Sequence, residues 1–282
     1  MKSIAITGGS GLVGSRLKEL LYSRFNFIDI TSEKLDIREA TAARDMLSSL
    51  ECDAFVHLAA YTDVDGAERD PEAARLLNVE GTRNVYEPIH ERGIPFVFFS
   101  TDFVFDGENP PYTEYSSRNP ISVYGRTKAE AEELVEEDGC IIRISYPYRA
   151  AFEKKRDFIR TLKTHLEQGR PLSLIEDSVV TPTFIDDIAA VLSRLLTEFK
   201  PGIVHAVGAS SHTPLEIGHA IADKFGYDSS LISPTSYKAY FAGKAQRPRR
   251  SRILPSLGFA TGMRTLDEGL NALMVHPDAK EL

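Results

Sequence analysis

The sequence is poor in the features that build metal sites, disulfides and membrane spans. Its 282 residues include only two cysteines, Cys52 and Cys140, and seven histidines, none with the spacing of a metal-binding motif. No stretch approaches the roughly 18 consecutive apolar residues of a membrane-spanning helix. Acidic residues outnumber basic ones by 41 to 33, and the net charge of −8 argues against a nucleic-acid-binding surface. We therefore expect no bound metal, no nucleic-acid partner and no membrane association.

Two further absences concern location and domain organisation. An apolar run begins at residue 3 and predicts a strand there, so we expect no signal peptide. Each of the two cysteines adjoins a predicted strand, where we expect it to pack as a small buried residue. A reducing cytoplasm is therefore the simplest expected location. No Gly/Ser-rich linker, internal repeat or low-complexity segment divides the chain, although its length suits one large α/β domain and a smaller lobe. We therefore expect the two parts to be interleaved.

A glycine-rich turn between a strand and a helix is the first informative motif. Residues 3–7 read as a buried parallel strand, and apolar residues in 12–22 recur at helical spacing. Between them, Gly8 allows a tight turn, Gly11 lets the backbone approach a pyrophosphate, and Gly14 lets the helix pack on the strand. A helix N-terminus also attracts phosphate groups. The motif predicts a dinucleotide site, and the alternative is a glycine cluster without a ligand.

The remaining pattern predicts a Rossmann-type doubly wound parallel sheet. Strands are predicted at 26–30, 54–58, 96–100, 140–145, 171–175 and 203–207, and helical segments at 39–50, 71–92, 121–137, 155–168, 184–199 and 214–225. Alternation of strands and helices places helices on both faces of the sheet. We expect a dinucleotide-binding domain of residues 1–145 plus about 179–208. Residues of about 146–178 plus 209–282 would form a smaller C-terminal substrate lobe.

A Tyr-x-x-x-Lys motif follows the fourth predicted strand. Tyr124 and Lys128 lie four residues apart on a predicted helix and therefore share a face. A free tyrosine has a pKa near 10, which a neighbouring ammonium and a nicotinamide cation can lower. Thr101, at the end of the fourth strand, can donate a hydrogen bond to the same oxygen. The trio fits carbonyl reduction, with Tyr124 as proton donor and the other two as electrostatic support.

One acidic residue bears on the choice of cofactor. Asp29 follows Gly8 by 21 residues, and an acid at about this distance commonly binds the ribose 2′-hydroxyl and repels a 2′-phosphate. Lys34 is the nearest base after that strand, and Arg16 on the preceding helix is another candidate for a phosphate. The strand register leaves an alternative in which Asp29 points into the core and Asp36 lines the adenine. We predict that NADH is accepted at least as well as NADPH.

These residues resemble the extended short-chain dehydrogenase/reductases and, within them, the dTDP-4-dehydrorhamnose reductases. The matching stretches are 59–68 (AAYTDVDGAE), 76–79 (LLNV), 100–107 (STDFVFDG), 123–128 (VYGRTK), 182–183 (PT) and 247–248 (RP), with Arg252 downstream. The resemblance implies NAD(P)H-dependent reduction of a 4-keto nucleotide sugar, most closely dTDP-4-dehydrorhamnose to dTDP-rhamnose. It implies that Thr101, Tyr124 and Lys128 are the catalytic residues. The oligomeric state stays open, with a homodimer as one alternative.

Motifs and resemblance together give the expected binding residues. For the cofactor they are Gly8, Ser10, Gly11, Leu12, Val13, Gly14, Asp29, Asp36, Ile37, Leu58, Ala59, Ala60, Tyr61, Ser100, Tyr124 and Lys128. For the nucleotide-sugar substrate they are Val64, Asp65, Thr101, Asp102, Phe103, Tyr146 and Arg247. The resemblance implies that Arg247 lies near the nucleotide sugar, and an arginine fork matches phosphate oxygens.

Two departures from the family pattern leave the sugar and the nucleotide base open. The family usually has tryptophan after the strand that here ends at Ser145, whereas this chain has Tyr146 and no tryptophan anywhere. It also tends to have glutamine and a small pair before Pro182, where this chain has SVVT at 178–181.

Other readings of the same motifs belong to different classes. One is a sugar-nucleotide epimerase or 4,6-dehydratase. Dehydratases resemble one another in a Thr-Asp-Glu acid and base, and Phe103 stands here in place of that glutamate. Another is a non-catalytic regulatory subunit that resembles the one of methionine adenosyltransferase.

Overall fold

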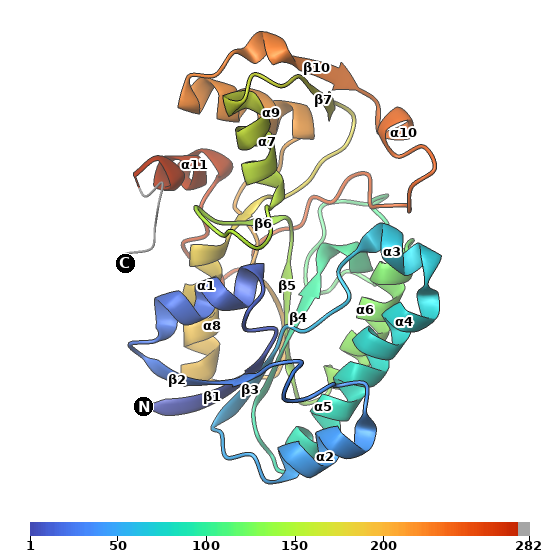
Figure 1. The fold of residues 1–282 in the computed structure, drawn as a ribbon, viewed down its shortest axis with the longest axis vertical. Coiled ribbons are helices and arrows are strands. Elements are labelled where there is room, and N and C mark those ends of the chain that lie inside the picture. The colour runs from blue at the N-terminus through green and yellow to red at the C-terminus, as the bar shows by residue number, and fades with distance from the viewer. Residues whose placement is uncertain (276–282) are drawn as a thin grey trace.

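A six-stranded parallel sheet forms the centre of the computed structural model, which describes residues 1–275 (Figure 1). The strand order is β2-β1-β3-β4-β5-β9, and every neighbouring pair is parallel. The strands are β1 (Lys2–Thr7), β2 (Phe25–Ile30), β3 (Ala54–His57), β4 (Phe96–Thr101), β5 (Cys140–Ile144) and β9 (Gly202–His205). The predicted Rossmann-type doubly wound sheet is confirmed.

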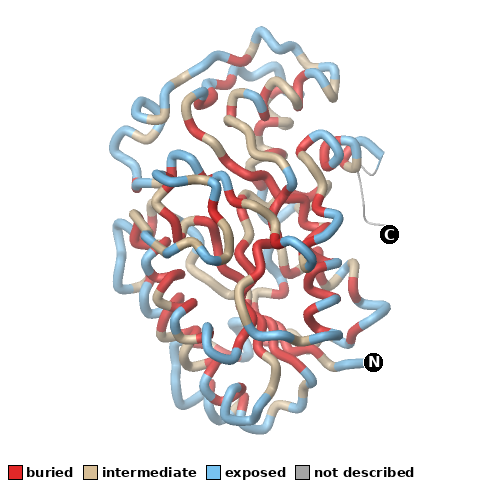
Figure 2. The backbone as a smooth tube through the Cα atoms, turned by 180° about the vertical axis from the view of Figure 1, so that it is seen from behind, coloured by how far each residue is buried: buried red, intermediate tan, exposed pale blue. Residues whose placement is uncertain are grey.

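Helices cover both faces of this sheet. On one face lie α1 (Leu12–Leu21) and α8 (Ile185–Thr197), and on the other lie α2 (Ala40–Ser48), α5 (Gly81–His90) and α6 (Val123–Val135) (Figure 1). Side chains alternate along each strand, so Ile4 and Ile6 pack toward α1 and α8 whereas Ala5 packs toward α2 and α5. Figure 2 shows the buried strands enclosed between half-exposed helices. In such sheets, ligands bind beyond the carboxyl ends of the strands.

The segment between β3 and α5 is more broken than the single helix predicted over 71–92. It contains α3 (Val64–Arg69), α4 (Pro71–Arg75) and a π-helical turn, η1 (Leu76–Glu80), that leads into α5. The Asp70 side chain accepts a hydrogen bond from the backbone of Ala73 and Pro71 occupies the first helical position, which separates α4 from α3. The six-residue helix α3 is too short for its periodicity to show in the sequence.

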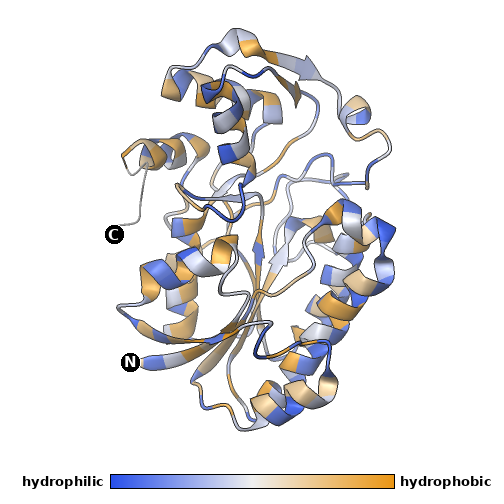
Figure 3. Ribbon diagram, viewed as in Figure 1, coloured by the Kyte–Doolittle hydropathy of each residue, from blue (hydrophilic) through white to orange (hydrophobic). Residues whose placement is uncertain are grey.

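A second group of elements packs beyond the carboxyl edge of the sheet (upper part of Figure 1). It contains two pairs of short strands, β6 (Pro147–Tyr148) with β8 (Thr183–Phe184) and β7 (Leu172–Ile175) with β10 (Ile232–Thr235). Its helices are α7 (Phe158–Glu167), α9 (Pro214–Phe225), α10 (Tyr237–Tyr240) and α11 (Leu266–Val275). Two 3-10 turns lie nearby, η2 (Asp102–Val104) and η3 (Ser229–Leu231). Helices α7, α9 and α11 bury their own apolar cluster (Figure 3). Because this cluster is separate from those of the sheet, we propose the predicted two-part division; residues 276–282 of the expected lobe lie outside the described residues.

Within residues 1–275, no helix is long and apolar enough to cross a membrane. In the same range, no three His, Cys, Asp or Glu side chains group as a metal site requires.

Candidate active site

The glycine-rich turn presents bare backbone to the open edge of the sheet. Gly8 has a φ of +67°, and a Cβ there would lie 2.7 Å from the backbone of Leu58 and Ala59. A Cβ at Gly14 would lie 2.5 Å from the carbonyl oxygen of Gly8. Gly11 caps α1 without a side-chain hydrogen bond, and the first turn holds no acidic residue, so the N–H groups are free for an anion. Ser10 is exposed, and Leu12 and Val13 are half-buried beside this turn. These residues fit the diphosphate of a dinucleotide.

Asp29 points toward the glycine-rich turn and not into the core. Its carboxylate lies against Gly9 and forms an ion pair with Lys18 of α1 at 2.6 Å. Lys34 Nζ donates to the backbone carbonyl of Asp29 at 2.9 Å. Sequence reasoning did not consider Lys18, although it lies four residues after Gly14 and hence on the same side of α1. Two cations and one acid therefore gather at the expected ribose position.

Three other residues that were considered for the adenosine end have partners elsewhere. Arg16 is buried and binds Asp186 through two hydrogen bonds of 2.7 Å. Asp36 pairs at the surface with Arg38, whose hydrogen bonds lower the pKa of Asp36 to about 2. Ile37 is buried in the core beside Gly81. Two basic residues were considered as partners of a 2′-phosphate. Arg16 is bound to Asp186 of α8, whereas Lys34 lies beside Asp29.

The loop after β3 connects the glycine-rich turn to α6. The backbone N–H of Leu58 donates to Thr7 at 3.2 Å, and Ala59 and Ala60 are half-buried beyond it. Asn78 of η1 is fully buried and forms two hydrogen bonds with the backbone of Tyr61. Its Oδ1 accepts from the Tyr61 N–H at 2.7 Å, and its Nδ2 donates to the Tyr61 carbonyl at 3.2 Å. It also donates to Thr127 of α6 at 2.9 Å. Sequence reasoning gave Asn78 no role, although it lies in the family-like stretch 76–79.

Ser100 and Lys128 lie below the mouth of the site. The Ser100 hydroxyl is buried and has no hydrogen-bond partner within the described chain, so its free group fits a bound ligand. Lys128 is 2% exposed, donates to the carbonyl of Phe99 at 2.8 Å and sits over the Phe98 ring at 3.9 Å. Burial lowers the pKa of the Lys128 ammonium to about 7.

Tyr124 and Thr101 lie together where β4 meets the start of α6. The close approach requires Gly125, because a Cβ there would overlap the carbonyl oxygen of Phe103. The rings of Phe103 and Tyr124 meet edge to face, with centroids 5.6 Å apart. Burial raises the pKa of Tyr124 to about 12, while a hydrogen bond with Thr101 opposes that rise. Lys128 is not among the causes of this shift, contrary to expectation, because its ammonium turns toward Phe99.

Asp102 and Tyr146 stand next to this pair. Asp102 is 1% exposed and accepts hydrogen bonds from Ser145 at 2.9 Å and from Ser251. Tyr146 has a φ of +41°, a left-handed conformation that costs a non-glycine residue roughly 1–3 kcal/mol. Burial raises the pKa of Tyr146, and the next largest influences are the charges of Asp102 and Arg247. The backbone strain and this placement mark the end of β5 as part of the site.

Arg247 connects the lobe to the sheet domain. Its guanidinium pairs with Asp65 of α3 at 2.9 Å and stacks 4.7 Å from the centre of the Phe241 ring. Asp65 also accepts the backbone N–H of Ala245 at 2.9 Å, and Val64, half-buried, begins the same helix. Two residues that were predicted separately to bind substrate are thus brought together as an ion pair.

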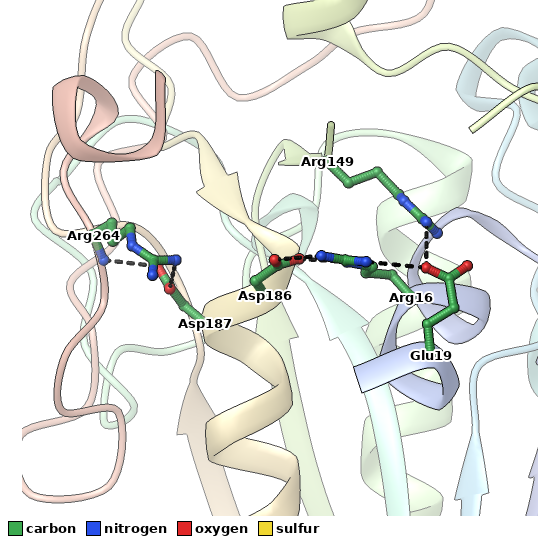
Figure 4. A network of polar contacts seen from close by, with 6 residues as sticks. All are labelled: Arg16, Glu19, Arg149, Asp186, Asp187 and Arg264. Atoms are coloured by element: carbon green, nitrogen blue, oxygen red, sulfur yellow. Dashed lines mark hydrogen bonds and ion pairs between the residues drawn. The ribbon is translucent and has the colours of Figure 1, made fainter. Parts of the chain in front are cut away.

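A second connection joins α1, α8 and the lobe (Figure 4). Glu19 of α1 binds both Arg16, at 3.2 Å, and Arg149, at 2.6 Å. Arg149 also donates to Ser15 at 3.0 Å. The pairs in Figure 4 involve Arg16, Glu19, Arg149, Asp186, Asp187 and Arg264. Sequence reasoning missed Arg149, because its partners lie more than a hundred residues away.

Comparisons with known proteins show the family to which this chain belongs. The family model described as the RmlD substrate binding domain matches residues 1–267. The probable low-salt glycan biosynthesis reductase of Haloferax volcanii is 32% identical over 87% of each chain. Methionine adenosyltransferase 2 subunit beta of Bos taurus is 28% identical over 94% of this chain and 84% of its own. The crystal structure of dTDP-4-dehydrorhamnose reductase from Bacillus anthracis in complex with NADP superposes with a TM-score of 0.89 at 26% identity, covering 98% and 99% of the two chains.

The fold and the site together define an oxidoreductase of the extended short-chain dehydrogenase/reductase type. The defining features are a parallel sheet, a glycine-rich turn at its first helix and a Tyr-Lys pair beyond its fourth strand. Within that class, the chain belongs to the RmlD substrate-binding domain family. The predicted resemblance and the expected enzyme class are confirmed. The individual site residues stay predictions.

Proposed function

We propose that this protein reduces the 4-keto group of a nucleotide sugar with NAD(P)H, and that its substrate is dTDP-4-dehydrorhamnose. The contact between Thr101 and Tyr124 at the end of β4 carries the proposal. The bound nicotinamide cofactor supplies the hydride. Tyr124 supplies the proton to the carbonyl oxygen, since its raised pKa keeps the phenol protonated at neutral pH. Thr101 donates a hydrogen bond to the same oxygen.

Other residues hold the reactants. The turn from Gly8 to Gly14 binds the cofactor diphosphate, and the loop of Ala59, Ala60 and Tyr61 lines it. Arg247 and Asp65 close on the substrate, where the guanidinium matches the nucleotide diphosphate. The solved relative that carries NADP and the reductases among the curated relatives support this assignment.

Oxidation of NADH and of NADPH against a panel of 4-keto nucleotide sugars tests the proposal. We expect turnover with dTDP-4-dehydrorhamnose above that with UDP- or GDP-linked ketosugars. Turnover with another sugar only would correct the substrate. Turnover with none would contradict the proposed function.

A regulatory role is the second candidate, because methionine adenosyltransferase 2 subunit beta is among the relatives. Co-purification with a methionine adenosyltransferase, together with no turnover on any ketosugar, would favour it.

A further inference from the structure

Asp102 is a buried carboxyl group surrounded by hydroxyl groups. Its Oδ2 receives two hydrogen bonds, from Ser145 Oγ at 2.9 Å and from Ser251 Oγ. Its Oδ1 lies 3.3 Å from Oγ1 of Thr101. No lysine, arginine or histidine in the described part of the chain is bonded to it. The ionisable groups that feel its charge are two phenols, Tyr124 from α6 and Tyr146 from the end of β5.

The number of hydrogens around Asp102 limits its protonation state. Each of the three hydroxyls carries a single hydrogen. An ionised carboxylate can only accept, so it draws all three hydrogens toward itself, and Thr101 then has none to donate to Tyr124 or to a substrate carbonyl. A carboxyl protonated on Oδ1 donates to Thr101 and still accepts both serine hydrogens on Oδ2. The ionised form also satisfies the bonds to Asp102, but only the protonated form leaves the Thr101 hydrogen free to point forward.

We propose that Asp102 is a positioning residue that stays a neutral acid, donates to Thr101 and thereby aims the Thr101 hydroxyl at the oxygen between Tyr124 and the substrate. The inference rests on the proposed function, which gives Thr101 and Tyr124 their roles. Burial raises the pKa of Asp102 against the effect of its three hydroxyl partners, which favours the same form. Carboxyl groups in apolar sites elsewhere are kept neutral and donate in this way.

Ser251 gives this arrangement a connection to the lobe. Its backbone N–H bonds the carbonyl of Val179 at 2.8 Å, and it follows the Arg247 segment directly. One of the two hydrogens that hold Oδ2 therefore comes from the chain segment that also carries Arg247. Because a donated hydrogen bond lowers the pKa of Asp102, seating of this segment acts on the carboxyl in the direction opposite to burial.

Replacing Asp102 by asparagine keeps a neutral hydrogen-bond donor at this position and removes the possibility of a negative charge. In Asp102→Asn the amide nitrogen can donate to Thr101 while the oxygen accepts from both serines, so we expect kcat within about tenfold of the wild type. Asp102→Ala removes the donor, and we expect a loss of about a hundredfold, the scale of a misdirected group at the reacting oxygen. In a Thr101→Val background the two substitutions should have equal effects, because Asp102 acts through Thr101.

The pH profile gives a second readout. As the pH rises through the pKa of Asp102, the ionised carboxylate turns the Thr101 hydrogen away, so the wild-type kcat should fall. Asp102→Asn should lack this fall. A loss in Asp102→Asn as large as in Asp102→Ala, or an unchanged fall in its pH profile, would overturn the inference.

An infrared measurement on the cofactor-free protein needs no turnover. The wild type minus Asp102→Asn difference spectrum at neutral pH should show the carbonyl band of a protonated carboxylic acid. Absence of this band overturns the inference, whatever the substrate is. Failure of the proposed function is a separate result. In that case the wild type shows the carbonyl band but turns over none of the ketosugars.

Discussion

The two sides of the candidate site are held in place by different means. On the sheet side, strand ends, a helix cap and the close approach of Gly125 to Phe103 fix Thr101 and Tyr124 through the backbone. On the lobe side, Arg247 is held by an ion pair with Asp65, a residue 182 positions away. Backbone contacts in a packed core allow little adjustment, whereas partly exposed ion pairs contribute little free energy and re-form easily. The proposed catalytic side chains are therefore fixed by packing, and the proposed substrate contacts are held by exchangeable charges.

The largest effect is expected on the sheet side. Tyr124→Phe should lower kcat by about two orders of magnitude or more, the scale of a lost general acid, because Tyr124 is the proposed proton donor beside Thr101. The dissociation constant of the cofactor, measured by fluorescence titration, should change little. Tyr22→Phe is a matched control, since Tyr22 is 67% exposed. Near-wild-type activity of Tyr124→Phe would remove the assignment of the proton donor.

Breaking the ion pair on the lobe side should act on binding. Arg247→Met should raise KM for the nucleotide sugar by about tenfold, which corresponds to about 1.4 kcal/mol, with kcat and cofactor affinity nearly unchanged. A double-mutant cycle with Asp65→Ala separates the pair from its individual partners. Arg249→Met is the control, because Arg249 pairs with Asp177 at the surface. An equal change in KM for the control would mean that the effect is not specific to this pair.

A smaller effect is expected at Tyr146, where the two sides meet. Tyr146→Ala should raise KM for the sugar nucleotide several-fold, and more than KM for the cofactor, because its ring lies near both Asp102 and Arg247. Steady-state kinetics with each reactant varied in turn measures both constants. If neither constant changes, Tyr146 only packs against Phe158, whose ring centroid lies 5.7 Å away.

The smallest effect concerns the choice between NADH and NADPH. Asp29→Ala should shift preference toward NADPH by a few-fold, because it removes a charge that repels a 2′-phosphate and frees Lys18. Lys18→Gln should shift it the opposite way. Direct titration of both variants with each cofactor measures the shift. A wild type that binds NADPH a hundredfold more tightly, about 2.7 kcal/mol, would show that Asp29 does not bind the ribose.

The sequence predicted the sheet side better than the lobe side, and the reason is physical. Strand ends and the shared face of Tyr124 and Lys128 follow from short-range periodicity, which the sequence displays. The sequence did not indicate the direction of the Lys128 ammonium, because that direction depends on the carbonyl of Phe99 and not on helix spacing. The pairing of Arg247 with Asp65 and the left-handed backbone of Tyr146 depend on how distant segments pack. No local pattern encodes those contacts.

Asn78 has a consequence for how such a protein can diverge. One amide holds the loop around Tyr61 and the helix that carries Tyr124, through its bond to Thr127. A substitution that moves the loop to suit another cofactor therefore also moves the catalytic helix, and such changes are tolerated only in combination. The lobe residues that the structure describes make no hydrogen bond with Asn78, so changes there leave this link intact. Descendants of this chain should therefore acquire new sugars more readily than new cofactors.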